Sequence, residues 1–204
     1  IGPPILLAPP RIWEKICSDI QVKIQEAVWI KKFIYHKLLP VGYRMADFIL
    51  AKKKPPIGWR LLSWAAYFFL LRSLNNYFGL TRLRHAYTGG APLGPEIFKM
   101  FLALGVKIKQ AYGATETTAA TIVHRTDDIR LDTVGQALPE VEVKTTDTGE
   151  LLTRGDMVFK GYYKNPEATA KAIVDGWFYS GDAALIDEDG HVVIIDRMAD
   201  VMKL

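Results

Sequence analysis

The stretch from Arg84 to Ala111 constrains the fold most, because strand and helix patterns alternate within it. Arg84–Thr88 and Val106–Ala111 are short segments typical of strands, and Gly94–Leu104 between them has the pattern of a helix. A strand, a crossover helix and a second strand predict a βαβ unit with parallel strands and a right-handed connection. Gly89-Gly90 predicts a tight turn after the first strand. Ligands bind beyond the carboxyl ends of strands in open α/β sheets, so the segments that follow the two strands are candidate ligand loops.

The part of the chain before this unit is predicted to be helical. Pro40 is expected to end one helix, and further helices are predicted over Tyr43–Lys52 and Trp59–Phe78. The first helix is indicated by apolar residues that recur every fourth position and would share one helix face, namely Ile12, Ile16, Ile20, Ile24 and Val28.

The part after Val134 is predicted to consist mainly of short antiparallel strands. Asn165 is expected to introduce a short helix over Pro166–Ile173. The side chains of Asp187 and Asp189 are interpreted only as turn residues. Two hairpins with glycine-containing turns are predicted, Val141–Thr145 with Glu150–Thr153 and Ala183–Ile186 with His191–Ile195. The expected fold class is therefore α/β, with a helical segment, a βαβ part of a mixed sheet and a small antiparallel sheet or barrel-like subdomain.

Charge is distributed unevenly along the chain. Residues 1–88 carry 14 Lys and Arg against 4 Asp and Glu, a net charge of +10, whereas residues 89–204 carry 12 against 18, a net charge of −6. The two parts are expected to have different surroundings. Cys17, the only cysteine, excludes an internal disulfide and is predicted to pack in a helix. The four histidines are scattered along the sequence, which argues against a zinc site.

The segment Gln110–Thr117 concentrates groups that suit a nucleotide. Tyr112 offers a face for stacking, Gly113 would let the backbone approach a ligand closely, and Thr115 could donate to a phosphate oxygen. Glu116 could hold a Mg²⁺ ion that accompanies phosphates. Taken alone, a strand followed by such a loop is more often an ordinary turn, and the pattern by itself leaves both interpretations open.

Further segments accompany Gln110–Thr117 in a fixed order. Thr88–Leu93 lies upstream, and Gly176–Asp182 and Ile195–Lys203 lie downstream. Together they resemble the motifs of the adenylate-forming, AMP-binding enzymes, which include acyl-CoA synthetases, luciferases and the adenylation domains of peptide synthetases. The resemblance extends over essentially the whole chain. It implies an internal fragment of that family's large N-terminal domain, and the start at Ile1 without a signal peptide fits this expectation.

The resemblance implies roles for individual residues. The backbone of Gly89–Pro92 is expected to lie against one face of an adenine, with Tyr112 on the other face. Catalytic roles are implied for Thr115, Glu116 and Lys203, and Glu116 is the implied Mg²⁺ ligand. The implied nucleotide-binding residues are Gly89, Gly90, Ala91, Pro92, Ala111, Tyr112, Gly113, Ala114, Thr115, Asp182 and Arg197.

Two of the implied roles near the end of the resemblance, those of Asp182 and Lys203, carry alternatives. Asp182 is expected to accept both ribose hydroxyls from a tight turn, and an ordinary turn aspartate is the alternative. Arg197 is expected on the ribose and phosphate side of the nucleotide, because a guanidinium stays charged and donates as a fork. Lys203 either reaches the nucleotide or is a solvated lysine. Ala199 departs from the Lys or Asp that is usual in the family's hinge segment, which leaves the hinge chemistry open.

The family reaction has two steps. A carboxylate attacks the α-phosphate of ATP to give an acyl-adenylate and pyrophosphate, and a thiol, expected to be coenzyme A, then displaces AMP. The family's lysine-bearing phosphate loop and its C-terminal domain with a catalytic lysine have no counterpart in this sequence. The chain alone is therefore expected to be inactive, since losing one charge-stabilising donor costs about 100- to 1000-fold in rate.

The start of the chain favours one branch of the family. Leu7–Lys15 and the helical stretch to about Leu80 resemble the corresponding segment and insertion of long-chain fatty acyl-CoA synthetases. A long-chain fatty acid is accordingly the expected substrate, together with ATP and coenzyme A. The alternatives are an aryl- or amino-acid-activating ligase, or a non-catalytic nucleotide- or acyl-binding module, for which only Ala199 speaks.

Basic and aromatic side chains are interleaved over residues 29–72. This pattern suits peripheral contact with an anionic membrane surface, and an amphipathic helix pair packed on the protein body is the alternative. Binding to nucleic acid is not expected, because no recognition motif accompanies the charge. A cytoplasmic location, peripheral to the membrane, is the corresponding expectation. The expected parts are a helical basic region over 1–82, an α/β part over 83–120, a β-rich subdomain over 121–195 and the start of a hinge over 196–204.

Overall fold

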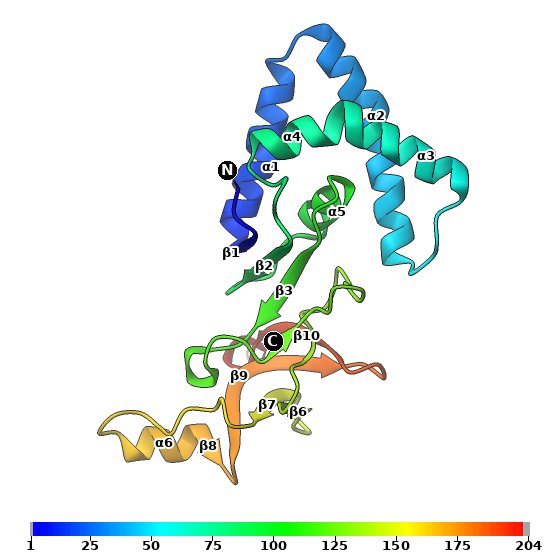
Figure 1. Ribbon diagram of the computed structural model, residues 1–204. Coiled ribbons are helices and arrows are strands. Elements are labelled where there is room, and N and C mark those ends of the chain that lie inside the picture. The colour runs from blue at the N-terminus through cyan, green and yellow to red at the C-terminus, as the bar shows by residue number, and fades with distance from the viewer. Residues whose placement is uncertain (1, 202–204) are drawn as a thin grey trace. The chain divides into compact units, whose positions relative to one another are not determined.

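The first of two compact units of the chain combines helices with a short parallel strand pair. The computed structural model describes residues 2–201, and the units divide between Lys109 and Gln110. Strand β1 pairs in parallel with β2, with Ile5 opposite His85. The elements of this unit are β1 (Ile5–Ala8), α1 (Pro10–Gln25), α2 (Trp29–Leu50), α3 (Ile57–Ala66), the π-helical turn η1 (Tyr67–Leu71), α4 (Arg72–Tyr77), β2 (His85–Gly89), α5 (Pro95–Ala103) and the start of β3 (Ile108–Tyr112), as Figure 1 shows.

The strand–helix–strand pattern of the sequence is confirmed in this unit. β2, α5 and β3 form where strand, helix and strand were predicted, and β2 and β3 are neighbours in the sheet. Strand β1 was not predicted, because four residues between prolines show no alternation of apolar and polar side chains. Its backbone groups are satisfied by pairing with a strand 80 residues later in the chain, which local pattern cannot reveal.

Two helical predictions were wrong in detail. Pro40 lies inside α2, so it does not end the helix. A proline within a helix removes one hydrogen bond, but Val41, Gly42 and Ala46 are buried just beyond it, and this packing keeps the helix continuous. In α1 the buried stripe is Trp13, Cys17 and Ile20. Of the predicted stripe of residues spaced by four only Ile20 belongs to it, since Ile12 is 44% exposed and Val28 lies beyond the end of the helix at Gln25.

The centre of this stripe is Trp13. Its indole Nε1 donates to Ala8 O at 3.2 Å, and its ring meets the edge of Phe101 with centroids 5.1 Å apart. The Sγ atom of Cys17 is buried 2.9 Å from Met100 Sδ, and burial raises the pKa of the thiol. Cys17 is therefore a packing residue, as predicted.

The second unit is a sheet of antiparallel strands. Its neighbours follow the order β3-β4-β5-β10-β9-β7-β6, and β8 pairs with β9. Both predicted hairpins, β6–β7 and β9–β10, are confirmed, and Asn165 caps the predicted short helix α6. The elements are the 3₁₀ turn η2 (Thr115–Thr117), β4 (Ile122–Val123), β5 (Gly135–Ala137), β6 (Glu142–Thr145), β7 (Glu150–Arg154), α6 (Pro166–Ala172), β8 (Ile173–Val174), β9 (Trp177–Ile186), β10 (His191–Arg197) and α7 (Met198–Val201).

The core of the second unit lies on one face of this sheet. It is formed by Ile122, Val134, Leu151, Ala184 and Val192, and Tyr112 packs against it. The fold is thus mixed α/β with an antiparallel β part, as the sequence predicted. Within residues 2–201 every helix is too short or too polar to cross a membrane.

Candidate functional site

Tyr112, Asp182 and Arg197 come together in the second unit, although 85 residues separate the first from the last. The Tyr112 hydroxyl donates to Asp182 Oδ2. Arg197 Nη1 lies 3.1 Å from Asp182 Oδ1, and the two residues face each other across the β9–β10 ladder. The sequence predicted all three as nucleotide-binding residues, and the fold places them in one cluster. The cluster offers an aromatic face, a carboxylate and a guanidinium to the same small volume.

Asp182 projects from an irregularity in β9. Leu152 of β7 faces Tyr179, but Glu150, two residues earlier, faces Ala183, four residues later. Two residues of β9 are therefore extra, and they form a bulge. The prediction of a tight turn at Asp182 was wrong, since this residue lies within a ten-residue strand. A bulge serves the same purpose, because it re-aims a side chain that a regular strand would hold in the ladder.

Polar contacts fix the shape of this bulge. Gly181 has φ +72°, a left-handed conformation that favours glycine, and its N–H donates to Glu150 Oε1 at 2.9 Å. The hydroxyl of Ser180 donates to Leu151 O at 2.7 Å and accepts from the Asp182 N–H at 3.1 Å. Hydrogen bonds made by Ser180, Gly181 and Asp182 thus stabilise the bulge. The Asp182 side chain is only 14% exposed.

The electrostatics of the cluster keep Tyr112 protonated. Burial, followed by the hydrogen bond to Asp182, raises the pKa of the Tyr112 hydroxyl well above its usual value of 10.0. Tyr112 is therefore a donor at neutral pH, and both carboxylate oxygens of Asp182 face positive or donor groups. A carboxylate held in this way can exchange these partners for the two hydroxyls of a ribose.

Glu116 lies on the short turn η2, next to the exposed Thr115. Thr117 stabilises the turn, because its hydroxyl accepts from the Ala114 N–H at 3.0 Å and donates to Ala114 O at 3.2 Å. The Glu116 carboxylate is half-buried, and its Oε1 accepts from the Tyr162 hydroxyl at 2.9 Å. The turn therefore carries a hydroxyl and a carboxylate on adjacent residues, and the phosphate and metal roles predicted for them stay predictions.

The structure gives a different reason for a glycine at position 113 from the one predicted. A Cβ atom at this position would lie 2.4 Å from Ala119 O. Close approach of the chain's own backbone therefore requires the glycine, whereas the sequence interpretation reserved the space for a ligand. The backbone that crowds it is itself unusual, since Thr118 and Ala119 have φ angles of +56° and +79°. Consecutive left-handed residues other than glycine are strained, and such strain clusters at functional sites. No residue pattern predicted this strain.

This turn can bind a Mg²⁺ ion only if a nucleotide supplies further oxygen ligands. Among residues 2–201 no group of three or more His, Cys, Asp or Glu side chains could hold a metal ion. Mg²⁺ characteristically takes one or two carboxylates and completes its shell with water and substrate phosphates. Glu116 with a nucleotide phosphate matches that pattern, so the residues present fit an ion that arrives with its nucleotide.

Of the remaining predicted residues, Ala111 lies in β3 next to Tyr112, and Ala114 is the residue that precedes η2. Gly89–Pro92 belongs to the first unit, at the end of β2, where Gly90 has φ +84° and open space around a Cβ position. Its predicted place against an adenine stays a prediction. Ala199 lies exposed on α7. Lys203 lies outside the described residues, and its catalytic role also stays a prediction.

Two histidines that are scattered in the sequence meet in the core of the second unit. His124 and His191 have ring centroids 6.3 Å apart, and Thr133 lies between them. Thr133 Oγ1 is 3.1 Å from His124 Nε2 and 3.0 Å from His191 Nδ1. His191 Nε2 lies 3.2 Å from Asp128 Oδ2. The sequence interpretation missed this network, because 67 residues separate the two imidazoles.

The network reaches the segment that carries Tyr112. The Gln110 N–H donates to His124 Nδ1 at 3.0 Å, so the neutral imidazole carries its proton on Nε2 and donates it to Thr133. Burial, with the charge of His191 as a further cause, lowers the pKa of His124 from 6.5 to about 4. The start of the motif is thus attached to a buried polar chain that ends at Asp128.

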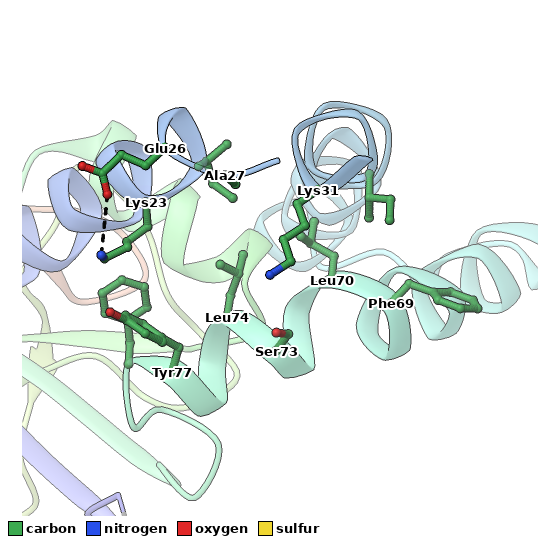
Figure 2. A pocket seen from close by; sticks show the side chains of 12 residues that line it. Lys23, Glu26, Ala27, Lys31, Phe69, Leu70, Ser73, Leu74 and Tyr77 are labelled. Atoms are coloured by element: carbon green, nitrogen blue, oxygen red, sulfur yellow. Dashed lines mark ion pairs between the residues drawn. The ribbon is translucent and has the colours of Figure 1, made fainter. Parts of the chain in front are cut away.

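A groove of about 400 Å³ lies in the first unit. Figure 2 shows Lys31, Leu70 and Leu74 along it, while Lys23 pairs with Glu26 at one end. Apolar side chains provide most of its wall, from α1, α2, η1 and α4. The lining residues are Lys23, Ile24, Glu26, Ala27, Lys31, Ile34, Phe69, Leu70, Ser73, Leu74, Tyr77 and Phe78. None of the predicted nucleotide residues belongs to it.

Comparison with known proteins places this geometry in context. The family profile described as AMP-binding enzyme matches residues 1–163. The chain is 30% identical over 205 residues to the long-chain-fatty-acid–CoA ligase FadD15 of Mycobacterium bovis, with 98% of this chain and 33% of the relative covered. It is 40% identical over 152 residues to luciferin 4-monooxygenase of Photuris pensylvanica, with 67% and 28% covered. The chain thus spans about a third of the length of these relatives.

Solved structures agree with this assignment. An ATP-bound chimera named RpMatB-BxBclM B3 superposes with a TM-score of 0.57 at 32% identity, covering 67% of this chain and 30% of that one. The likeness includes sequence as well as fold at this level of identity. The profile match covers most of the chain. The chain therefore belongs to the AMP-binding enzyme family.

Proposed function

We propose that this chain supplies the adenosine-binding part of an ATP-dependent, AMP-forming acid–thiol ligase. The observation that carries the proposal is the cluster of Tyr112, Asp182 and Arg197. In this assignment Asp182 accepts the ribose hydroxyls, the ring of Tyr112 stacks on adenine, and Arg197 donates toward the ribose and phosphate side. Gly89–Pro92 is proposed as the second wall of the adenine pocket.

The same assignment gives the turn η2 its chemistry. Thr115 donates to a phosphate oxygen, and Glu116 would hold Mg²⁺ together with that phosphate. When bound, the ion supplies positive charge that offsets the phosphate charge during attack. A carboxylate oxygen forms a bond to the α-phosphorus, and the bond to the pyrophosphate leaving group breaks. In the second step the thiol of coenzyme A attacks the acyl carbon and AMP leaves. Lys203 is proposed to assist at the nucleotide.

A binding measurement tests the nucleotide site directly. Replacing Asp182 by Asn removes one acceptor oxygen and the charge, and we expect the affinity of the 204-residue chain for ATP to fall about tenfold or more. Isothermal titration calorimetry measures this affinity. Asp147→Asn is the matched control, because this exposed aspartate lies in the β6–β7 turn. Equal affinity of the Asp182→Asn variant and the unsubstituted chain would contradict the site.

We propose a long-chain fatty acid as the acid substrate. The fatty-acid–CoA ligase relative aligns with 98% of this chain, including the helical region, whereas the luciferin 4-monooxygenase aligns with 67%. The groove in the first unit supports the same choice, because it has apolar walls and the ammonium group of Lys31 at its side. Pockets of this volume hold small ligands. An aryl acid is the second candidate.

The acid is identified by carboxylate-dependent exchange between ATP and pyrophosphate. We propose to assay a protein with the full length of the relatives against acetate, octanoate, palmitate, a benzoate and amino acids. Exchange that rises most with palmitate supports the fatty acid, and exchange only with benzoate supports the aryl alternative. No exchange by a folded protein would favour a non-catalytic nucleotide- or acyl-binding module. The 204-residue chain itself is expected to show no exchange.

We also propose peripheral contact of the helical region with anionic membrane. Several of its aromatic side chains are exposed, including Trp29 at 75% and Trp64 at 69%. Basic side chains lie over other aromatic rings. Lys37 Nζ is 5.8 Å from the ring centroid of Phe33, and Arg72 Cζ is 6.0 Å from that of Phe68. Such mixed surfaces bind anionic interfaces, where fatty acids partition. Flotation with anionic vesicles at low salt checks this proposal, and a chain that stays at the bottom of the gradient would refute it.

A further inference from the structure

A loop after β7 is fastened to the turn that carries Glu116. The N–H of Phe159 donates to Glu116 O at 2.7 Å. The Thr118 hydroxyl donates to Met157 O at 2.8 Å. These bonds hold the backbone of the loop against η2, and Phe159 packs edge-to-face on Phe178 with centroids 6.0 Å apart. The loop is therefore attached both to the candidate metal ligand and to the sheet.

The same loop delivers Tyr162 to the Glu116 side chain. Tyr162 donates its hydroxyl proton to Glu116 Oε1 at 2.9 Å, and this bond raises the pKa of the phenol. The backbone of Tyr162 is anchored in turn, because its N–H donates to Thr169 Oγ1 at 2.9 Å. Thr169 lies in α6 and donates to Asn165 O at 2.9 Å. The phenol thus approaches Glu116 from a supported position.

The hydrogen bond engages one carboxylate oxygen of Glu116. Within residues 2–201, Oε2 of Glu116 takes part in no further hydrogen bond or ion pair. A carboxylate fixed through one oxygen keeps its plane and presents the other oxygen in a constant direction. Outer hydrogen bonds of this kind orient metal ligands, and removing them typically costs about 10- to 100-fold in metal affinity or activity.

We infer that Tyr162 is a positioning residue for the Mg²⁺ ligand Glu116. The phenol holds Oε1, and Oε2 is left to face the ion that accompanies the nucleotide. This inference rests on the proposed function, because it takes Glu116 as the metal ligand. It adds a residue, in a loop remote in sequence from the Gln110–Thr117 motif, whose contribution is confined to the metal-dependent part of nucleotide binding.

The test separates metal-dependent from metal-independent binding. The affinity of the 204-residue chain for ATP is measured by calorimetry in EDTA and across a Mg²⁺ titration. For Tyr162→Phe we expect unchanged affinity in EDTA and a rise of about tenfold or more in the Mg²⁺ concentration that gives half of the metal effect. Tyr163→Phe is the matched control, since this neighbouring tyrosine is 88% exposed. It should behave as the unsubstituted chain does.

Two further variants complete the design. Glu116→Gln removes the charge of the ligand itself and should cause the largest loss of the Mg²⁺ effect. Thr169→Val removes the hydroxyl that anchors Tyr162, and we expect a smaller shift in the same direction. Binding in EDTA also reports on folding, because a variant that unfolds loses it together with the metal effect.

The possible failures are distinguishable. If Glu116→Gln loses the Mg²⁺ effect but Tyr162→Phe keeps it, the inference is overturned and the nucleotide site stands. An equal loss with and without metal in Tyr162→Phe would reveal a general structural role and also overturn it. If Glu116→Gln keeps the full Mg²⁺ effect, Glu116 is not the ligand and the inference falls with that role. Absence of ATP binding by the unsubstituted chain would refute the proposed site itself.

Discussion

Asp182 is engaged by its own chain through both carboxylate oxygens. Tyr112 donates to one oxygen and Arg197 faces the other. A ribose would therefore exchange existing hydrogen bonds rather than fill empty positions, and the net gain per bond would be modest. In return, the Asp182 carboxylate loses little further hydration or conformational freedom on binding, because it is already mostly buried and held in position. Affinity at this site should depend on how easily Arg197, which is 66% exposed, turns away toward the phosphates.

His124 makes a prediction about acidity. Its folded-state pKa is lowered to about 4, below the unfolded value of 6.5, so the native state resists a proton that the unfolded chain accepts. The contribution of neutral His124 to the free energy of unfolding is fully present above pH 6.5. It amounts to up to about 3 kcal/mol and is lost as the pH falls through 4. His191 opposes the charge on His124, whereas Asp128 and Asp132 favour it.

Urea unfolding of the chain at pH 7.5, 5.5 and 4.5 measures this effect. His124→Gln retains an acceptor and a donor but cannot titrate in this range, so its free energy of unfolding should vary less with pH. His36→Gln, a substitution at an exposed histidine of the first unit, is the control. An identical pH profile for His124→Gln and the unsubstituted chain would exclude His124 as the group responsible.

At the scale of elements, the helix cap at Asn165 offers a second prediction. Asn165 Oδ1 accepts from the Ala168 N–H at 3.0 Å, and this bond satisfies one of the free donors at the start of α6. Asn165→Ala should lower the free energy of unfolding by about 1 kcal/mol. Glu167→Ala breaks only the exposed ion pair with Lys171 and should change stability by less than about 0.5 kcal/mol. Equal effects of the two changes would argue against the cap.

Elements with a local cause were predictable from the sequence, and elements with a distant cause were not. The Asn165 cap and the Thr146–Gly149 turn are written in neighbouring residues, and both predictions are confirmed. Strand β1 depends on β2, and the continuity of α2 through Pro40 depends on tertiary packing, so local rules failed at both. The bulge at Asp182 depends on the register between β7 and β9, which the Ser-Gly-Asp sequence alone does not determine.

The candidate site shows the same division. Tyr112, Asp182 and Arg197 were recognised by their motifs, and the fold brings them together. Tyr162 and the His124–Thr133–His191 network were missed, because their relevance arises only from contacts across 46 and 58–67 residues. Residues that lie together in a motif can be recognised in the sequence, whereas residues that support them from distant segments cannot.

At the scale of the whole molecule, the two units should respond to different ligands. Tyr112, Glu116, Asp182 and Arg197 all belong to the second unit, and the apolar groove belongs to the first. ATP with Mg²⁺ should slow amide hydrogen exchange at Thr115–Thr117 and in the middle of β9. The helices around the groove should be unaffected by the nucleotide, and mass spectrometry of peptides resolves these regions.

The same exchange measurement tests the predicted adenine wall. Slower exchange at Gly89–Pro92 on addition of ATP would support its place in the nucleotide site, and unchanged exchange there would refute it. A further addition of palmitate should slow exchange along the groove of the first unit. Palmitate that changes no peptide of this unit would count against the groove as an acyl site.

The bulge in β9 has a consequence for how this protein can be altered. Side chains of a strand alternate between its two faces, so an insertion of an even number of residues leaves the parity of everything beyond it unchanged. The bulge contains two extra residues. A chain from which Ser180 and Gly181 were removed could therefore close the ladder between β7 and β9 and keep every later side chain on its present face. The sheet could persist without the ribose-binding geometry, so foldability and nucleotide recognition are separable properties of one strand.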